Sequence, residues 1–284
     1  MFKKIFFVTA LLLASLLSAK PVVIASIAPV EYLAKAVGGD KIEVQSLAKG
    51  DVHSYEPKPN DMKAVAKASL FIAAGLEFEE AWIPRFKASA KNLVVVKSDA
   101  KIAKLKEERG EQAEHDEKHE AHADPHVWLN PMLAITMARN ISDALIDMDK
   151  ANKDFYLENF QKLMNDLLAF DESAKNELAG LKNRKFVVYH PAWGYFAAHY
   201  DLEQISIERS GKEPKIDEMA STLKMIKDEN IKVIFADPNR SQKSAQILAS
   251  QTGAKVELLD PLGYNLLENL KIAVGAIKDA NSPK

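Results

Sequence analysis

The stretch "ANKDFYLENFQKLMNDLLAFDESAKNELAG", residues 151–180, has no proline and no glycine before its last position. Its apolar residues recur at roughly helical spacing, at Phe155, Phe160, Leu163, Leu167, Leu168 and Phe170. Nearly thirty residues of α-helix would extend for about 40 Å. Such a helix could span two lobes as a strut or pack along one domain, and the sequence leaves both arrangements open.

Short β-branched runs alternate with helical patterns on both sides of this stretch. On the N-terminal side we expect buried parallel strands at 22–26, 42–47, 70–75 and 93–96, with helices such as 28–37 and 61–68. On the C-terminal side we expect strands at 186–189, 202–207, 232–236 and 255–259, and helices near 193–200, 216–228, 241–251 and 266–277. This alternation predicts the α/β class, with two lobes that each contain a parallel sheet flanked by helices.

The N-terminus predicts export from the cytoplasm. Residues 1–19 contain Lys3 and Lys4, an apolar run, and small residues ending at Ala19, a layout typical of a cleaved secretory signal peptide. An uncleaved anchor is the alternative, although the run is short for a membrane span. The remaining chain is expected to divide into an N-terminal lobe (20–130), a helical segment with the linking helix (131–182) and a C-terminal lobe (183–284).

The composition limits the chemistry of the chain. With 47% hydrophobic and 27% charged residues, the 284-residue chain is typical of globular proteins, and a formal charge of −2 gives no reason to expect a nucleic-acid partner. It has no cysteine, so disulfides and a lipid-bearing thiol are excluded. A freely soluble, monomeric periplasmic protein fits these features, and any transition-metal site must use histidine and carboxylate.

Four metal-capable side chains occupy stiffened loops where a cleft between lobes could open. His53, His190 and Asp260 each follow a predicted strand, and His126 lies between Pro125 and Pro131. Three imidazoles and one carboxylate would complete a tetrahedral shell that suits Zn²⁺, whereas a shell richer in oxygen would favour Mn²⁺.

Four motifs, in this order, resemble the zinc/manganese-binding family of ABC-importer solute-binding proteins, most closely its zinc-uptake type: "DVHSYEPKPND", "DPHVWLNP", "HPAWGYFAAHY" and "LDPLG". The resemblance covers the mature chain. It implies two α/β lobes joined by one long helix, a metal ion clamped between them, and delivery of that ion to a membrane permease. By these motifs the ligand roles fall on His53, His126, His190 and Asp260, and His190 favours zinc because manganese-binding relatives tend to have glutamate there. The segment "FADP" (235–238) departs from relatives that have glutamate before proline.

Three further histidines, His115, His119 and His122, lie in the acidic segment 107–124, which contains eight carboxylates. Its composition predicts a flexible loop. Zinc-type relatives also carry a His-rich acidic loop here, so the segment could collect metal weakly, or it could be a solvated loop with incidental histidines. We expect no role for His199.

Other functions were weighed against metal capture. A secreted zinc hydrolase would need an open coordination site and a general base, and "HEAH" (119–122) lacks the histidine spacing of the metalloprotease helix. A manganese-binding member of the same importer class is a second alternative. Surface adhesion is a third, because some members of the family are described as adhesins. Trp193, Tyr195 and Phe196 could form a binding platform, but we expect them to pack in the core.

Overall fold

A computed structural model describes residues 20–106, 123–208 and 216–281 of the chain. The expected signal peptide (1–19) and the three histidines of the acidic segment, His115, His119 and His122, lie outside the described residues. Within the described part, no helix has both the length and the apolar character needed to cross a bilayer.

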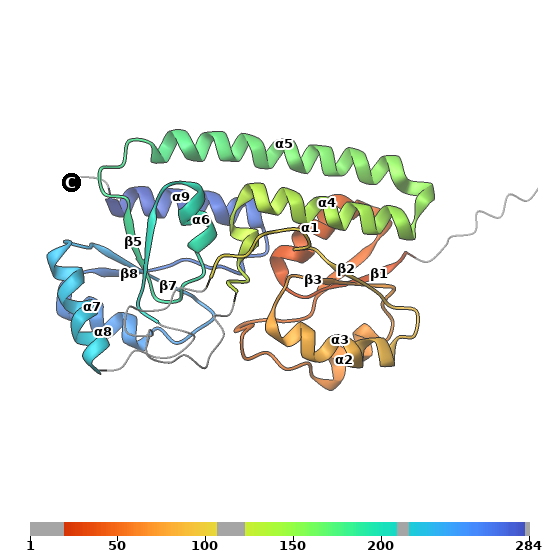
Figure 1. The fold of residues 1–284 in the computed structure, drawn as a ribbon, viewed down its shortest axis with the longest axis horizontal. Coiled ribbons are helices and arrows are strands. Elements are labelled where there is room, and N and C mark those ends of the chain that lie inside the picture. Colours follow the sequence, from red (N-terminus) through yellow and green to blue (C-terminus); the bar gives the residue numbers. More distant parts are fainter. Residues whose placement is uncertain (1–19, 107–122, 209–215, 282–284) are drawn as a thin grey trace, which may run out of the picture.

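Two four-stranded parallel sheets form the framework (Figure 1). The N-terminal sheet has the order β2-β1-β3-β4, and its strands are β1 (Val22–Ala25), β2 (Glu43–Ser46), β3 (Leu70–Ala73) and β4 (Val94–Lys97). The C-terminal sheet has the order β6-β5-β7-β8, and its strands are β5 (Lys185–Val188), β6 (Glu203–Ser206), β7 (Val233–Ala236) and β8 (Lys255–Leu258). Both sheets therefore repeat one connectivity, which confirms the predicted α/β class with two lobes.

Helices cover both faces of each sheet (Figure 1). In the N-terminal lobe, α1 (Ala28–Gly38) lies on one side of the sheet, and α2 (Pro59–Val65) and α3 (Glu77–Ser89) lie on the other. In the C-terminal lobe, α9 (Leu266–Asn281) lies opposite α7 (Ile216–Asp228) and α8 (Lys243–Thr252), and α6 (Gly194–His199) follows β5. Short 3₁₀ turns occupy Gly39–Lys41 (η1), Val127–Leu129 (η3) and Lys150–Asn152 (η4).

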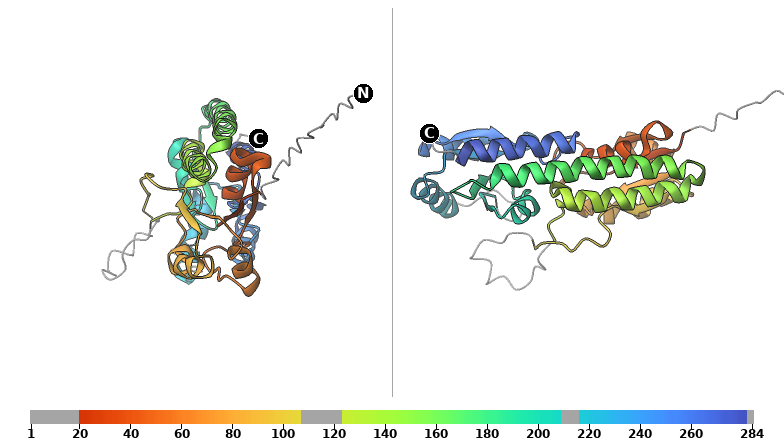
Figure 2. Two further views of the ribbon diagram at one scale, coloured as in Figure 1. Left: turned by 90° about the vertical axis from the view of Figure 1, so that its right-hand side faces the viewer. Right: turned by 90° about the horizontal axis from the view of Figure 1, so that it is seen from above.

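The segment between the two sheets forms two antiparallel helices, and the second one, within residues 151–180, spans the molecule. Helix α4 (Pro131–Met148) begins with proline at its first position, and the Asn130 side chain accepts hydrogen bonds from the backbone of Met132 and Leu133. Helix α5 (Lys153–Leu178) has 26 residues and extends for about 40 Å. It packs against α4 and α1 at one end and α9 at the other, so it is the predicted strut (Figures 1 and 2).

The expectation that the four N-terminal strands are buried was wrong at the edges of that sheet, and an edge strand of the C-terminal sheet is also poorly covered. Strands β3 and β7 are buried at all four positions, whereas β2, β4 and β8 contain only half-buried and exposed residues. An edge strand has a neighbour on one side only, so flanking helices cover it less completely. The lobe boundaries at 130 and 182 stay predictions.

Helix α3 was not among the helices named from the sequence. Pro84 lies in its interior and removes one backbone donor. Its start is held by Glu79, whose buried carboxylate accepts hydrogen bonds from the backbone N–H groups of Ala74, Gly75 and Leu76. Burial raises the pKa of Glu79 although these bonds oppose the shift. A polar anchor at the helix start thus compensates for a poor helical sequence.

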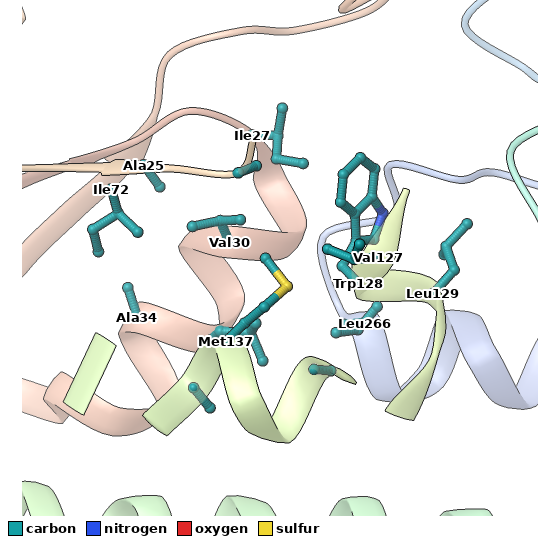
Figure 3. Close-up of a cluster of buried hydrophobic side chains, with 14 of the residues drawn as sticks. Ala25, Ile27, Val30, Ala34, Ile72, Val127, Trp128, Leu129, Met137 and Leu266 are labelled. Atoms are coloured by element: carbon teal, nitrogen blue, oxygen red, sulfur yellow. The ribbon is translucent and has the colours of Figure 1, made fainter. Parts of the chain in front are cut away.

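A single hydrophobic core continues from one lobe into the other (Figure 3). Trp128 lies at the crossing, fully buried between Ile27 of the N-terminal lobe and Leu266 at the start of α9. Its indole Nε1 donates a hydrogen bond of 2.7 Å to the carbonyl oxygen of Pro261. A second, smaller cluster lies between the C-terminal sheet and helices α7 and α8. The lobes are therefore joined by buried side chains as well as by α5.

We predict that Trp128→Ala lowers the free energy of unfolding by about 3–5 kcal/mol, because it opens a cavity in the shared core and leaves the Pro261 carbonyl without its donor. Urea titration followed by circular dichroism measures this loss. Trp82→Ala is the matched control, since this tryptophan is half-buried on α3 with Arg85 over its ring. Equal losses in the two variants would contradict a central role for Trp128.

Candidate metal centre

The four predicted ligands lie on loops at the carboxyl ends of strands or between the lobes. His190 and Asp260 each come two residues after a strand, β5 and β8 respectively. His53 follows β2 through a turn at Gly50, whose φ of 82° is a conformation that favours glycine. His126 immediately precedes the η3 turn. Open parallel sheets place their ligand sites at these strand ends, so the topology positions these side chains for a site between the lobes.

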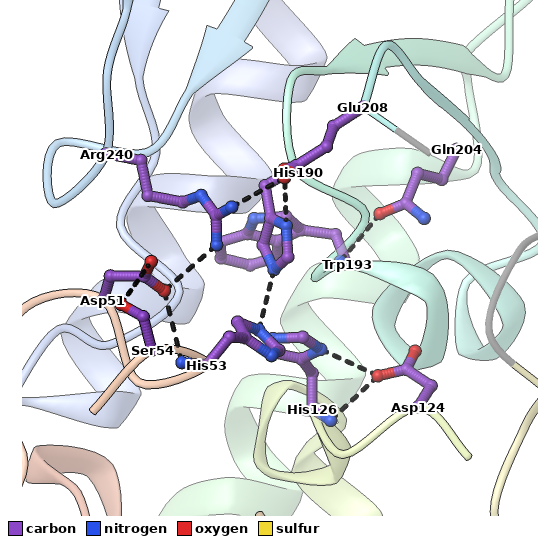
Figure 4. A network of polar contacts seen from close by, with 10 residues as sticks. All are labelled: Asp51, His53, Ser54, Asp124, His126, His190, Trp193, Gln204, Glu208 and Arg240. Carbon is purple, nitrogen blue, oxygen red and sulfur yellow. Dashed lines mark hydrogen bonds and ion pairs between the residues drawn. The ribbon is translucent and has the colours of Figure 1, made fainter. Parts of the chain in front are cut away.

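Three histidines come together into one cluster (Figure 4). His53, His126 and His190 each offer a ring nitrogen, and these nitrogens all lie within 4.8 Å of one another. The Nε2 atoms of His53 and His190 are 3.2 Å apart. The ring centroids are separated by 5.4 Å (His53–His126), 4.9 Å (His53–His190) and 5.2 Å (His126–His190). Residues far apart in the chain thus direct their nitrogens at a common point.

Two buried carboxylates fix the orientation of two of these rings. Nδ1 of His126 is 2.8 Å from Oδ1 of Asp124, and Nδ1 of His190 is 2.9 Å from Oε2 of Glu208. A carboxylate accepts a hydrogen bond, so the Nδ1 atom carries the proton and the Nε2 lone pair is left for another partner. The short Nε2–Nε2 contact then requires His53 to donate to His190, and a bound cation would replace that hydrogen bond.

The surroundings favour neutral imidazoles. Desolvation of the His53 ring, followed by the charges of His126 and Arg240, lowers the pKa of His53 to about 4. Part of the residue remains exposed to solvent. Burial, followed by the charges of His126 and His53, holds the pKa of His190 well below its ordinary value. Metal ions bind the unprotonated ring, so both side chains are in the ligating form at neutral pH.

Asp260 lies at the end of β8, and the cluster found among the described residues does not include it. Its Oδ1 accepts hydrogen bonds from the Asn239 side chain (2.9 Å) and from the backbone of Leu262 (2.8 Å). These bonds engage one of its two oxygens. The assignment of Asp260 as a fourth ligand therefore stays a prediction.

Three residues that organise the site were not predicted from the sequence: Asp124, Glu208 and Arg240. Glu208 comes two residues after β6, as His190 does after β5, so the rule that found His190 could have found it. Arg240 is in the loop after β7, and nothing in its sequence surroundings distinguishes it from a surface arginine.

Asp124 was placed in the flexible acidic segment, but the structure shows it buried and ordered. Its backbone N–H donates to the Leu105 carbonyl (2.9 Å), and its own carbonyl accepts from the Tyr195 hydroxyl (2.7 Å). Next to it, Lys106 and Ala123 form an antiparallel bridge. These contacts, together with the bond to His126, hold Asp124 in place beside the histidine cluster.

Two further expectations can be compared with the structure. Trp193, Tyr195 and Phe196 are all buried, which confirms that they pack in the core rather than form a binding platform. His199, for which no role was expected, has its Nε2 2.6 Å from Oδ1 of Asp171 and so links α6 to α5. It is remote from the histidine cluster in its contacts and belongs to the scaffold.

The arrangement suits a cation that prefers nitrogen ligands. Three imidazoles with restrained orientation provide three of the four corners of a tetrahedron and leave one position for a further donor. Zn²⁺ commonly takes such ligands, and the carboxylates behind His126 and His190 raise the basicity of the rings.

Comparisons with known proteins agree with this chemistry. Residues 23–280 match the family model described as zinc-uptake complex component A, periplasmic. The high-affinity zinc uptake system protein ZnuA of Bacillus subtilis is 30% identical over 279 residues, covering 91% of this chain and 86% of that protein. A crystal structure of ZnuA superposes with a TM-score of 0.86 at 34% identity, covering 93% of this chain and all of that one. A ZnuA deletion mutant with zinc bound, lacking residues 138–173 of its own chain, gives the same TM-score and identity over 93% of this chain and 99% of that one.

We predict that the His53 ring of the metal-free protein titrates with a midpoint near pH 4, as measured by NMR of the imidazole resonances. The unfolded chain protonates this ring near pH 6.5. Between these values the unfolded state binds more protons than the folded state, so the contribution of His53 to stability is lost as the pH falls from 6.5 towards 4.

The His53→Gln variant provides the control for this titration. Its free energy of unfolding should decline less steeply than that of the unaltered protein over the same pH window, as measured by urea titration at a series of pH values. Identical slopes, or a midpoint near pH 6.5 by NMR, would show that the ring is not desolvated.

Proposed function

This chain belongs to the family of periplasmic zinc-uptake component A proteins, and from that premise we propose that it captures Zn²⁺ and delivers it to an importer of the ABC type. The observation that carries the proposal is the cluster of three imidazole nitrogens within 4.8 Å of one another, two of them oriented by buried carboxylates. A site of this kind recognises an ion by its preferred ligands and geometry.

The proposed ligands are His53, His126, His190 and Asp260. The first three form the cluster, and Asp260 would supply the fourth donor with the oxygen that Asn239 and Leu262 do not engage. This set of three nitrogens and one oxygen favours Zn²⁺ over Mn²⁺, which prefers oxygen-rich shells. Four protein ligands leave no position for an activated water, so binding without catalysis is proposed. Nothing in the comparisons favours the secreted hydrolase considered from the sequence.

The proposed setting is the periplasm, reached after removal of residues 1–19, with a membrane permease as the partner and the protein acting as a monomer. The homology to zinc-uptake proteins supports this setting. We further propose that the lobes move little on binding, because α5 spans both of them and the core around Trp128 is continuous between them. Comparing metal-free and zinc-loaded protein by small-angle scattering tests this, and a rotation of tens of degrees would contradict it.

We predict that His126→Ala lowers zinc affinity by more than about 100-fold, since loss of an orienting partner behind a ligand already costs 10–100-fold. Alanine at His53, His190 or Asp260 should also weaken binding. Isothermal titration calorimetry with Zn²⁺ and with Mn²⁺ measures the effect, and His199→Ala is the matched control because His199 pairs with Asp171. An unchanged zinc affinity in His126→Ala would exclude the proposed site.

His115, His119 and His122 are proposed as weak accessory ligands that raise the local metal concentration. Deletion of residues 111–122, which retains the pairing of Lys106 with Ala123, should leave one tight zinc equivalent and remove the weaker ones. Calorimetry to saturation measures both classes of site. A deletion that abolishes tight binding would mean that the ligands have been assigned to the wrong histidines.

A further inference from the structure

Arg240 contacts both lobes beside the histidine cluster (Figure 4). It lies in the loop after β7, in the C-terminal lobe. Its Nη1 is 3.1 Å from Oδ1 of Asp51, which is in the loop after β2 of the N-terminal lobe. Its Nη2 is 2.6 Å from Oε1 of Glu208, in the loop after β6. One guanidinium group thus joins loops from two separate sheets.

Each of these two carboxylates also holds one of the clustered histidines. Glu208 uses its other oxygen to bind Nδ1 of His190 at 2.9 Å. Asp51 accepts the backbone N–H of His53 at 3.2 Å through the oxygen that faces Arg240, while its second oxygen accepts the Ser54 hydroxyl at 3.0 Å. The contact between the Nε2 atoms of His53 and His190, at 3.2 Å, completes a closed circuit of polar contacts. This circuit of contacts runs from His190 through Glu208, Arg240 and Asp51 to His53, and from His53 back to His190.

Burial and charge distinguish this network from a surface ion pair. The side chains of Glu208 and Arg240 are 3% and 15% exposed, and that of Asp51 is 33% exposed. A buried carboxylate such as Glu208 needs a nearby cation, because an unpaired buried charge is strongly destabilising. The planar guanidinium can bind two carboxylates at once through separate nitrogens, which a lysine ammonium cannot do with the same geometry.

We infer that Arg240 is a positioning residue that ties the loop of His53 to the C-terminal lobe and so holds the cleft closed when no metal is bound. The inference rests on the proposed metal site and adds a device that arranges its ligands before the ion arrives. Helix α5 and the core around Trp128 join the bodies of the lobes, whereas the contacts of Arg240 with Asp51 and Glu208 join the loops beside the proposed ligands. Zinc would take over this connection by binding His53 and His190 together.

The inference predicts a difference between the metal-free and the metal-bound states that a purely stabilising residue would not produce. In the variant Arg240→Gln, the metal-free lobes should sample a wider range of separations, within the limited motion that α5 and the core around Trp128 allow. After zinc is added, the separation should return to that of the unaltered protein, because the ion then joins the loops. Asp51→Asn should loosen the metal-free state in the same way while it leaves the bonds of Glu208 to Arg240 and His190 in place.

The separation can be measured by double electron–electron resonance, since the chain has no cysteine and labels can be introduced at will. Lys63→Cys on α2 and Gln251→Cys on α8 are exposed positions. Both helices lie on the side of the molecule opposite α5, where opening changes the distance most (Figure 1). Distances are recorded after chelator treatment and again with Zn²⁺, in the unaltered background and in each variant, with circular dichroism to confirm folding.

Two variants serve as controls. Arg240→Lys keeps the charge but reaches one carboxylate, so it should restore part of the metal-free closure. Lys224→Gln removes a cation from the exposed pair with Asp228 on α7 and should leave both distances unchanged.

The inference is wrong if the metal-free distances in Arg240→Gln equal those of the unaltered protein. Should that variant fail to fold, the same result in Asp51→Asn would overturn the inference. Equal widening in the metal-free and zinc-loaded states would also overturn it, because that result indicates general destabilisation. Titration of the unaltered protein with Zn²⁺ by calorimetry tests the proposed function separately from the inference about Arg240. Absence of zinc binding there would refute the function, whereas the metal-free distances test the tether in either case.

Discussion

The site depends on hydrogen bonds between buried carboxylates and the Nδ1 atoms of two histidines. Asp124 and Glu208 fix the tautomers of His126 and His190, and this directs their Nε2 lone pairs to one point. Without these bonds each ring could flip or exchange its proton between nitrogens. Burial adds a second constraint, because it keeps the imidazole of His190 neutral and therefore able to bind a cation.

The fold supplies the positions from which these side chains meet. Both lobes use the same strand order, and the loop after β2 in one lobe and the loop after β5 in the other each carry a histidine, although these two strands occupy different positions in their sheets. Helix α5 spans both lobes, and the shared core around Trp128 joins them internally. The family to which the chain belongs therefore has a scaffold in which two similar halves build a single site from unlike loops.

Much of this could be predicted from the sequence, because strand and helix periods and residues at strand ends are local signals. The strands, the strut helix, His53 and His190 were found in this way, and His126 was found from the two prolines that flank its loop. Asp124 was missed because its acidic neighbours predict a flexible loop, whereas its order comes from Leu105, Tyr195 and His126. Arg240 was missed because its partners, Asp51 and Glu208, are remote in sequence and meet it only after both lobes have folded.

The pairing of Lys106 with Ala123 has a consequence for how such a protein can evolve. Together with the bonds from Leu105 to Asp124 and Tyr195, it closes the chain at the base of residues 107–122. Strand-like closure of this kind lets the intervening stretch be lengthened, shortened or recomposed while Asp124 and His126 keep their places. Natural selection can therefore change the sequence of residues 107–122 independently of the buried site.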